Sequence, residues 1–337
     1  MIFDEDIAAV NRTLAPLWPR LEGAHIFMTG GTGFIGRWML EALVRSGTAA
    51  DVTLLSRDPA AFAQRAPHIA ARCRLVTGEI DSFTVPETDY THVIHGATDA
   101  SADLNARDPR RMFDTIVGGT RRVLDLAAAC GSPRLLFMSS GAVYGVQPWD
   151  MSHVAEDWHG GPDPCDPKSA YGEGKRAAET LCAIYGRQFG LDVVTARIFA
   201  LLGPLLALGI HFAAGNFIRD AIEGRTIRVE SAGTAVRSYL YAADLAVWMW
   251  TLLVRGEPGA VFNLGSEEAV SIADLARRTA AVLGGPGVEV LGQPDPGWNP
   301  GRYVPSTVAI RQALGVAATV GLDEAIRRTA LSNGWKP

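Results

Sequence analysis

The residues best suited to chemistry are a tyrosine and a lysine spaced four apart, Tyr171 and Lys175, in the segment SAYGEGKRAAE. At this spacing two side chains project from one face of a helix, so the ammonium can approach the phenol. A nearby positive charge favours the phenolate and lowers the pKa of the tyrosine, which makes it a usable acid or base near neutral pH. Such pairs also occur on helices without any catalytic role. Here Ser139 and Ser140 end an earlier apolar stretch, where a hydroxyl could hold a substrate oxygen beside the tyrosine.

A second signal is the glycine-rich segment HIFMTGGTGFIG at residues 25–36. An apolar run precedes the glycines and a helical pattern over residues 37–45 follows them. In such a strand–turn–helix unit the first glycine allows a tight turn, the second allows close approach of a pyrophosphate, and the third lets the helix sit near the strand. Backbone N–H groups and the positive helix end then face the phosphates. A turn chosen for packing alone is the alternative. We predict a dinucleotide site formed by Gly30, Thr32, Gly33, Phe34, Ile35 and Gly36.

The end of the next expected strand, residues 52–55, bears on the choice of dinucleotide. A carboxylate about 20 residues past the glycines would bind the ribose 2′-hydroxyl and favour NAD. This chain has Ser56 and Arg57 there, followed by Asp58. A hydroxyl and a guanidinium suit a 2′-phosphate, so we predict NADP, with NAD as the alternative if Arg57 is only a solvated loop charge. Further cofactor contacts are expected at the ends of the third and fourth strands, from Glu79, Ile80, Gly96, Ala97 and Thr98.

The elements that must position these residues alternate between apolar strands and helices. Strands are expected at residues 52–55, 74–77, 92–95, 135–138 and 193–198, besides the first one, and a long helix at residues 106–130. Alternation of this kind predicts an α/β fold with a doubly wound parallel sheet. A short amphipathic helix at residues 6–14 should lie on the domain surface.

The pattern changes near residue 200, where proline and glycine become denser. We predict that residues 1–200 form a dinucleotide-binding domain and that a segment near 240–265, with a strand at 261–264, rejoins it. Residues 201–337 should mainly form a smaller substrate-binding lobe. Within this lobe the sequence predicts helices at residues 271–283 and 323–332, the first with Ser271 as its cap.

Composition narrows the function classes. The 337 residues are 48% hydrophobic and 20% charged, with a formal net charge of −5. No basic stripe indicates nucleic acid or a membrane surface, and no apolar run is long enough to cross a bilayer. The start of the chain is acidic where a signal peptide would be basic, and the four cysteines show no CxxC spacing. We therefore expect a cytoplasmic protein without a metal site.

Taken together, the segments TGGTGFIG, HVIHGAT, MSSGAVYG, YGEGK, RIFALLGP, RSYLYAADLA, VFNLGS and LGVAATVGLDEAI resemble the extended short-chain dehydrogenase/reductases that act on nucleotide-diphosphate sugars. The resemblance covers nearly the whole chain. It implies a Rossmann domain with a small sugar-nucleotide lobe, and often a homodimer built on two helices from each subunit.

The resemblance also implies roles for individual residues. Tyr171 would be the catalytic acid/base, Lys175 would hold the nicotinamide ribose, and both would touch the cofactor. Ser140 matches the catalytic serine or threonine of the family, and Ser139 beside it would also face the substrate. Arg237 matches the arginine that binds the diphosphate. Asn216 and Arg302 would be further diphosphate contacts, with a capping asparagine and a surface arginine as the alternatives. The other expected roles are a packed pocket wall for Tyr144, a helix cap or brace for Asp244 and a place in the substrate lobe for His211.

Three features of the chain, at four positions, depart from the family pattern. The 4,6-dehydratases of the family usually carry an acidic pair directly after the catalytic serine or threonine, and this chain has Gly141 and Ala142. Dehydration by that route is therefore not expected. Ile116 and Ala200 stand where the family often has asparagines, which removes two polar contacts near the cofactor or sugar.

Three functions remain open. The first is net reduction of a 4-keto, often 6-deoxy, nucleotide sugar by NADPH, which the Arg57 argument favours. The second is C4 epimerisation through a transient ketone with tightly held NAD. The third is a non-catalytic NADP-binding sensor, which the loss of any of Ser140, Tyr171 or Lys175 would have supported; all three are present.

Overall fold

The computed structural model describes residues 2–84, 89–98, 102–131, 133–209, 213–285, 287–295, 297, 299 and 301–337. Seven parallel strands form its central sheet, in the order β11-β6-β5-β4-β1-β2-β3. The chain winds outward in both directions from β1, so the carboxyl ends of β1 and β4 flank a crevice where such sheets bind ligands. The predicted doubly wound α/β fold is confirmed. The strands are β1 His25–Thr29, β2 Asp51–Ser56, β3 Cys73–Thr77, β4 His92–His95, β5 Arg134–Ser140, β6 Asp192–Ile198 and β11 Val261–Leu264.

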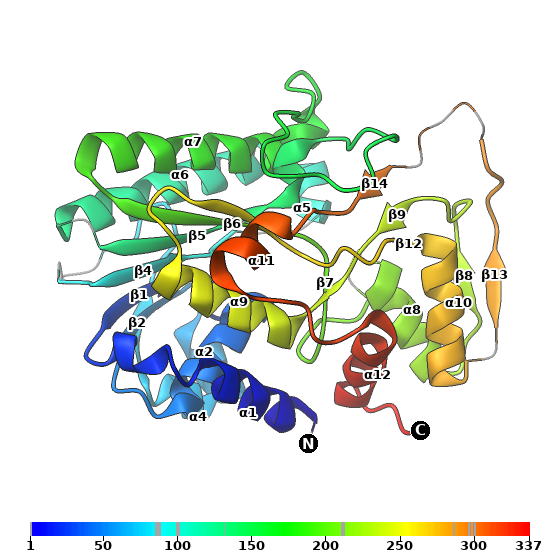
Figure 1. The fold of residues 1–337 in the computed structure, drawn as a ribbon, viewed down its shortest axis with the longest axis horizontal. Helices are drawn as coiled ribbons and strands as arrows, with labels where there is room; N and C mark the ends of the chain where they lie inside the picture. Colours follow the sequence, from blue (N-terminus) through cyan, green and yellow to red (C-terminus); the bar gives the residue numbers. More distant parts are fainter. Residues whose placement is uncertain are drawn as a thin grey trace.

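Helices cover both faces of this sheet (Figure 1). On one face lie α5 Ala102–Arg107, α6 Pro109–Ala129 and α7 Ala170–Phe189, whose apolar side chains pack with those of β4 and β5 into one core cluster. On the other face lie α1 Ile2–Leu14, α2 Phe34–Ser46, α3 Pro59–Arg65, α4 Pro67–Ala70 and α9 Ala242–Arg255, which share a second, larger cluster. Both faces of the inner strands β1, β4 and β5 are therefore buried, whereas the edge strand β3 stays partly exposed.

The N-terminal helix is more deeply integrated than a surface helix. On α1, Ile7, Val10 and Leu14 are buried against α2 and α9. The Asp6 carboxylate is also buried, and it accepts hydrogen bonds from Tyr241 and from Arg328 near the other end of the chain. The helix thus ties the sheet domain to the C-terminal helix.

The helix predicted over residues 106–130 is α6, which begins at Pro109, whereas residues 106 and 107 end the shorter helix α5 and Asp108 separates the two. Pro109 has no N–H group to continue the first helix, and the Asp108 carboxylate caps the second by accepting from the Arg111 N–H at 3.0 Å. None of the helices in the described part of the chain combines the length and apolar composition needed to span a bilayer.

Most elements that follow β6 gather at one end of the sheet (Figure 1). Three helices pack together there, and three small sheets connect them to the rest. Two of these sheets are built from two-residue strands, which bring distant parts of the chain together. The helices are α8 Ala213–Ile222, α10 Ile272–Leu283 and α12 Leu322–Ser332, with α11 Val308–Leu314 lying against α9 and β11; the small sheets are β7 Leu201–Leu202 with β10 Leu240–Tyr241, β8 Ile227–Val229 with β13 Val288–Val290, and β12 Val270–Ser271 with β9 Val236–Arg237 and β14 Arg302–Tyr303.

Candidate active site

The structure brings Ser140, Tyr171 and Lys175 together at the carboxyl end of β5. Ser140 is the last residue of that strand, and Tyr171 and Lys175 lie on successive turns of α7, which packs against it. The Lys175 ammonium donates to the Met138 carbonyl at 2.8 Å and lies 5.1 Å from the centre of the Phe137 ring. The two groups from the helix are therefore fixed against the strand that supplies the serine.

Burial dominates the electrostatics of these groups. It lowers the pKa of Lys175 from its ordinary value of 10.5 to about 8. It raises the pKa of Tyr171, and a hydrogen bond with Ser140 opposes that rise. The expectation that Lys175 lowers the pKa of this tyrosine is therefore not met, because the loss of water around the phenol outweighs nearby stabilisation. A protonated Tyr171 is thus the form favoured at neutral pH.

Asn105 on α5 is a supporting residue that the sequence did not reveal. Its side-chain oxygen accepts the Tyr171 N–H at 3.1 Å, and its amide donates to the Lys168 carbonyl at 2.8 Å. The first turn of a helix has N–H groups without partners inside the helix, so this contact satisfies one of them and holds the start of α7 in place.

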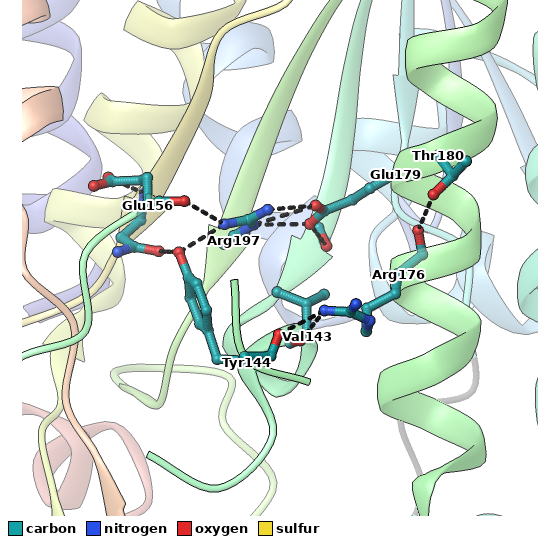
Figure 2. Close-up of polar contacts among 10 residues, drawn as sticks. Val143, Tyr144, Glu156, Arg176, Glu179, Thr180 and Arg197 are labelled. Carbon is teal, nitrogen blue, oxygen red and sulfur yellow. Dashed lines mark hydrogen bonds and ion pairs between the residues drawn. The ribbon is translucent and has the colours of Figure 1, made fainter. Parts of the chain in front are cut away.

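A polar network of largely buried side chains joins Glu179, Arg197 and Tyr144 (Figure 2). Glu179, one turn after Lys175, forms an ion pair with Arg197 of β6 at 2.7 Å, and the side chains of both are 15% exposed. The Arg197 guanidinium also donates to the Tyr144 hydroxyl at 2.8 Å, and that hydroxyl donates to Asn263 at 2.8 Å. The network therefore links α7, β6 and the loop that follows Ser140.

Ser139 belongs to this network. Its hydroxyl donates to the Glu179 carboxylate at 2.5 Å. Neighbouring residues of a strand point to different sides, so Ser139 contacts Glu179 whereas Ser140 contacts Tyr171. The substrate role of Ser139 stays a prediction. Tyr144 is 2% exposed, which agrees with a packed residue rather than a catalyst.

The glycine turn after β1 has the shape of a dinucleotide cradle. Gly30 has a φ of +76°, and a Cβ there would lie 2.5 Å from the Gly96 carbonyl carbon at the end of β4. A Cβ on Gly36 would lie 2.4 Å from the Gly30 oxygen. Gly33 precedes α2 without a side-chain cap, so the first N–H groups of this helix face outward from the turn.

Two threonines, Thr29 and Thr98, lie beside this glycine turn. The Thr29 hydroxyl accepts the N–H groups of Gly96 and Ala97 at 3.2 and 3.1 Å and contacts the buried His95 ring at 2.8 Å. The Thr98 hydroxyl is buried without a hydrogen-bond partner. An unsatisfied buried hydroxyl and a turn that excludes side chains both fit a bound NAD-type cofactor, which would supply a nicotinamide that accepts or returns a hydride. The predicted Thr32, Phe34 and Ile35 lie in this turn and the first turn of α2.

The residues predicted to contact the adenosine end lie along the ends of β2 and β3. Ser56 is buried and its hydroxyl accepts the Asp58 N–H at 3.2 Å, whereas Arg57 is exposed. The Asp58 carboxylate caps α3 by accepting the Ala61 N–H at 2.9 Å. After β3, an open pocket of about 440 Å³ is lined by Glu79, Ile80, Asp81, Asp108, Arg110, Arg111, Asp114 and Thr115.

The two predicted diphosphate arginines occupy neighbouring strands. The register of β9 and β14 pairs Arg237 with Tyr303, and Arg302 with Val236. Since successive residues alternate between faces, Arg302 lies on the opposite face from Arg237, and its guanidinium is 5.4 Å from the centre of the Trp149 ring. The Arg237 guanidinium donates to the Val236 and Gly301 carbonyls, and the Nε of Arg302 is buried without a partner.

The other predicted substrate residues are more dispersed. Asn216 lies half-buried on α8, and His211 lies outside the described residues. Asp244 accepts hydrogen bonds from Thr319 and the Val320 N–H, which fits the predicted bracing role. No group of three histidine, cysteine or acidic side chains lies close enough to bind a metal in the part of the chain that the structure describes.

Tyr303 is, after Asn105, a second residue at this site that sequence reasoning missed. Its hydroxyl lies 3.5 Å from the Ser140 Oγ, although the two residues are far apart in the chain. No sequence pattern predicts a strand of two residues, so nothing marked Tyr303 as part of the catalytic end of the sheet.

Comparisons with known proteins agree with this geometry. The sequence profile described as "NAD dependent epimerase/dehydratase family" matches residues 26–265. A UDP-glucuronic acid decarboxylase 1 from Xenopus tropicalis is 30% identical over 308 residues, which are 90% of this chain and 71% of the relative.

Two solved structures have a similar fold. The UDP-glucose 4-epimerase of Thermotoga maritima, determined with UDP-glucose, aligns with a TM-score of 0.78 at 21% identity, over 92% of this chain and 98% of that one. The UDP-glucose 4-epimerase of Thermus thermophilus, in complex with NAD, aligns with a TM-score of 0.75 at 25% identity, over 92% of this chain and 99% of that one.

Proposed function

Because this chain belongs to the NAD-dependent epimerase/dehydratase family, we propose that it moves a hydride between a nicotinamide cofactor and a ring carbon of a nucleotide-diphosphate sugar. The observation that carries the proposal is the meeting of Ser140, Tyr171 and Lys175 at the carboxyl end of β5. The glycine cradle opens at the same edge of the sheet, two strands away.

Each of the three residues has a defined task in this proposal. Oxidation of a sugar hydroxyl releases a hydride from its carbon and a proton from its oxygen, and Tyr171 can take that proton only as the phenolate, the form that a positively charged nicotinamide and the Lys175 ammonium would favour. In the reverse direction Tyr171 returns that proton to the carbonyl oxygen. Ser140 donates a hydrogen bond to the same oxygen, and the buried Lys175 places a positive charge where the cofactor ribose and the phenol meet.

The named relatives favour a reaction that leaves the cofactor in its starting oxidation state. Epimerisation interconverts isomers, and decarboxylation exchanges a carboxylate for a hydrogen with loss of CO2, so neither consumes a hydride overall. We therefore rank a redox-neutral reaction on a UDP-sugar first, with NAD retained between oxidation and reduction.

Net reduction of a 4-keto nucleotide sugar by NADPH is the second candidate. It is favoured by Ser56 and the exposed Arg57 at the end of β2, together with the use of the Asp58 carboxylate as a helix cap. A carboxylate already committed to a helix is less available to a ribose hydroxyl, and a guanidinium attracts a 2′-phosphate.

Purified enzyme incubated with UDP-glucose, UDP-galactose, UDP-glucuronic acid or a 4-keto nucleotide sugar separates these reactions. A redox-neutral enzyme changes the sugar nucleotide with no lasting change in cofactor absorbance, whereas a reductase consumes NADPH in proportion to keto sugar. Tyr171→Phe should abolish either activity while cofactor still binds. Turnover at the wild-type rate in this variant would remove the assignment, and binding of NADP without any turnover would support the sensor alternative.

We also propose a homodimer formed through α6 and α7. Phe113 on α6 and Ile184 and Phe189 on α7 are exposed large apolar side chains, at 36%, 40% and 53%. Sedimentation analysis should give twice the mass of one chain, and Ile184→Glu should shift the protein to monomer.

A further inference from the structure

Tyr303 reaches the catalytic end of the sheet from the C-terminal part of the chain. Its ring packs on Phe199, with the ring centres 4.5 Å apart. Its hydroxyl oxygen is 3.5 Å from the Ser140 Oγ and 3.5 Å from the Ile198 carbonyl oxygen. A Cβ on Gly141 would lie 2.7 Å from that hydroxyl, so the phenol occupies space that only a glycine at position 141 leaves open.

The position of Tyr303 affects the direction in which the Ser140 hydroxyl can donate its proton. A serine hydroxyl donates one hydrogen bond and accepts two. The Ala142 N–H already occupies one acceptor position of Ser140 at 3.2 Å. If Tyr303 donates to the other, the only proton of Ser140 must point away from both, toward Tyr171 or a substrate oxygen. If Ser140 donates to Tyr303 instead, the Tyr303 hydroxyl donates to the Ile198 carbonyl, and the serine proton is withdrawn from the reacting centre.

The distances from the Tyr303 hydroxyl to Ser140 and to Ile198 fix neither of these two hydrogen-bond arrangements. Hydrogen bonds between hydroxyls are usually 2.5–3.0 Å long, so both contacts of Tyr303 are long. A sugar oxygen that accepts from Ser140 would favour the first arrangement, because it provides the serine proton with a partner.

We propose that Tyr303 is a positioning residue, which donates to Ser140 and thereby directs the serine proton onto the reacting oxygen of the sugar. This inference rests on the proposed function and adds a residue to it. Burial and the neighbouring Tyr171 raise the pKa of Tyr303, so the phenol keeps its proton and can serve as this donor at neutral pH. Since β14 belongs to the small sheet beside the main one, the catalytic centre is complete only when these two parts of the fold are together.

A double-mutant cycle with Ser140→Ala and Tyr303→Phe tests the inference. Tyr303→Phe keeps the ring on Phe199 and removes only the hydroxyl. It should lower kcat about tenfold and leave KM within about twofold, because the lost hydrogen bond acts on the transition state. The double variant should match Ser140→Ala within about twofold, since Tyr303 has no serine proton left to direct.

Tyr90→Phe is the matched control. It also removes a phenol hydroxyl from a ring packed on a phenylalanine, but Tyr90 precedes β4 and so lies at the opposite end of the strands from Ser140. It should leave kcat unchanged. A kcat for Tyr303→Phe equal to this control, or a further tenfold loss in the double variant, would overturn the inference. If the inference about Tyr303 is overturned but Tyr171→Phe is inactive, the proposed function stands without a role for Tyr303. If Tyr171→Phe keeps full turnover, the proposed function itself is contradicted.

A crystal structure of the NAD complex gives a second measurement that needs no turnover. The inference requires the Tyr303 hydroxyl to lie within about 3 Å of the Ser140 Oγ. A Tyr303 ring turned away from Ser140 would overturn it, whatever substrate the enzyme proves to use.

Discussion

Gly30→Ala adds a methyl group to the turn between β1 and α2, where the structure leaves no room for one. The new Cβ would lie 2.5 Å from the Gly96 carbonyl carbon and 2.7 Å from the Ala97 nitrogen. Both neighbours are backbone atoms, so they cannot rotate aside as the end of a side chain would. The φ of +76° at this position adds conformational strain for any residue other than glycine.

The expected cost has two parts. A left-handed conformation costs an alanine about 1–2 kcal/mol, and overpacking of a rigid site costs about 1–3 kcal/mol. The free energy of unfolding should therefore fall by about 3 kcal/mol. The Kd for NAD should also rise by about tenfold or more, because the turn must move away from β4 and its N–H groups then face the phosphates less directly.

Gly47→Ala is the control for conformational strain alone. Gly47 ends the same helix with a φ of +82°, and a Cβ there would meet nothing within 4 Å. This variant should lose about 1 kcal/mol and bind NAD with an unchanged Kd. Urea titrations and fluorescence titrations with NAD measure both quantities. Equal losses of stability in the two variants, or an unchanged Kd in Gly30→Ala, would refute the close approach of β1 and β4 as the reason for the glycine.

Three further predictions follow from buried or exposed charges. Lys175 has a pKa near 8 in the folded protein and 10.5 in the unfolded chain, so the unfolded chain binds more protons between these values. The free energy of unfolding of the wild type should therefore rise relative to that of Lys175→Met by up to about 3 kcal/mol between pH 8 and pH 10.5. If urea titrations show that the two free energies differ by the same amount at both pH values, the lowered pKa is contradicted. Glu179→Gln should lower the free energy of unfolding by about 3 kcal/mol, because it leaves the Arg197 charge buried without its partner; a loss below about 1 kcal/mol would show the pair to be unimportant. Arg57→Ala should weaken NADP binding about tenfold and NAD binding little in calorimetric titrations, and equal effects on the two cofactors would reject the 2′-phosphate interpretation.

The strands of the main sheet could be predicted because each of them, four to seven residues long, contains at least two adjacent apolar residues. Glycine spacing likewise identified the turn after β1, and the spacing of Tyr171 and Lys175 identified the face of α7 that meets β5. These signals are local, so one stretch of sequence contains all the information needed.

The features of the site that could not be predicted depend on contacts between residues far apart in the sequence. Tyr303 reaches Ser140 only through the two-residue strand β14, which is too short to show a period in the sequence. The contact of the Ser139 hydroxyl with Glu179 likewise joins residues 40 positions apart, which a sequence reading does not show. The pKa of Tyr171 also followed the burial of the phenol rather than the nearby lysine charge, and burial is a property of the whole fold.

Reduced nicotinamide formed on the enzyme tests the central claim most directly. Wild-type protein mixed rapidly with NAD and a UDP-sugar should show a transient absorbance of the reduced cofactor, which forms as the sugar hydroxyl loses its hydride and disappears as the sugar is reduced again. Tyr171→Phe should not show it, although it binds both molecules. Identical traces from the two proteins would contradict the account. It would also be contradicted if UDP-glucose, UDP-galactose and UDP-glucuronic acid gave no reduced cofactor and a 4-keto nucleotide sugar did not oxidise NADPH.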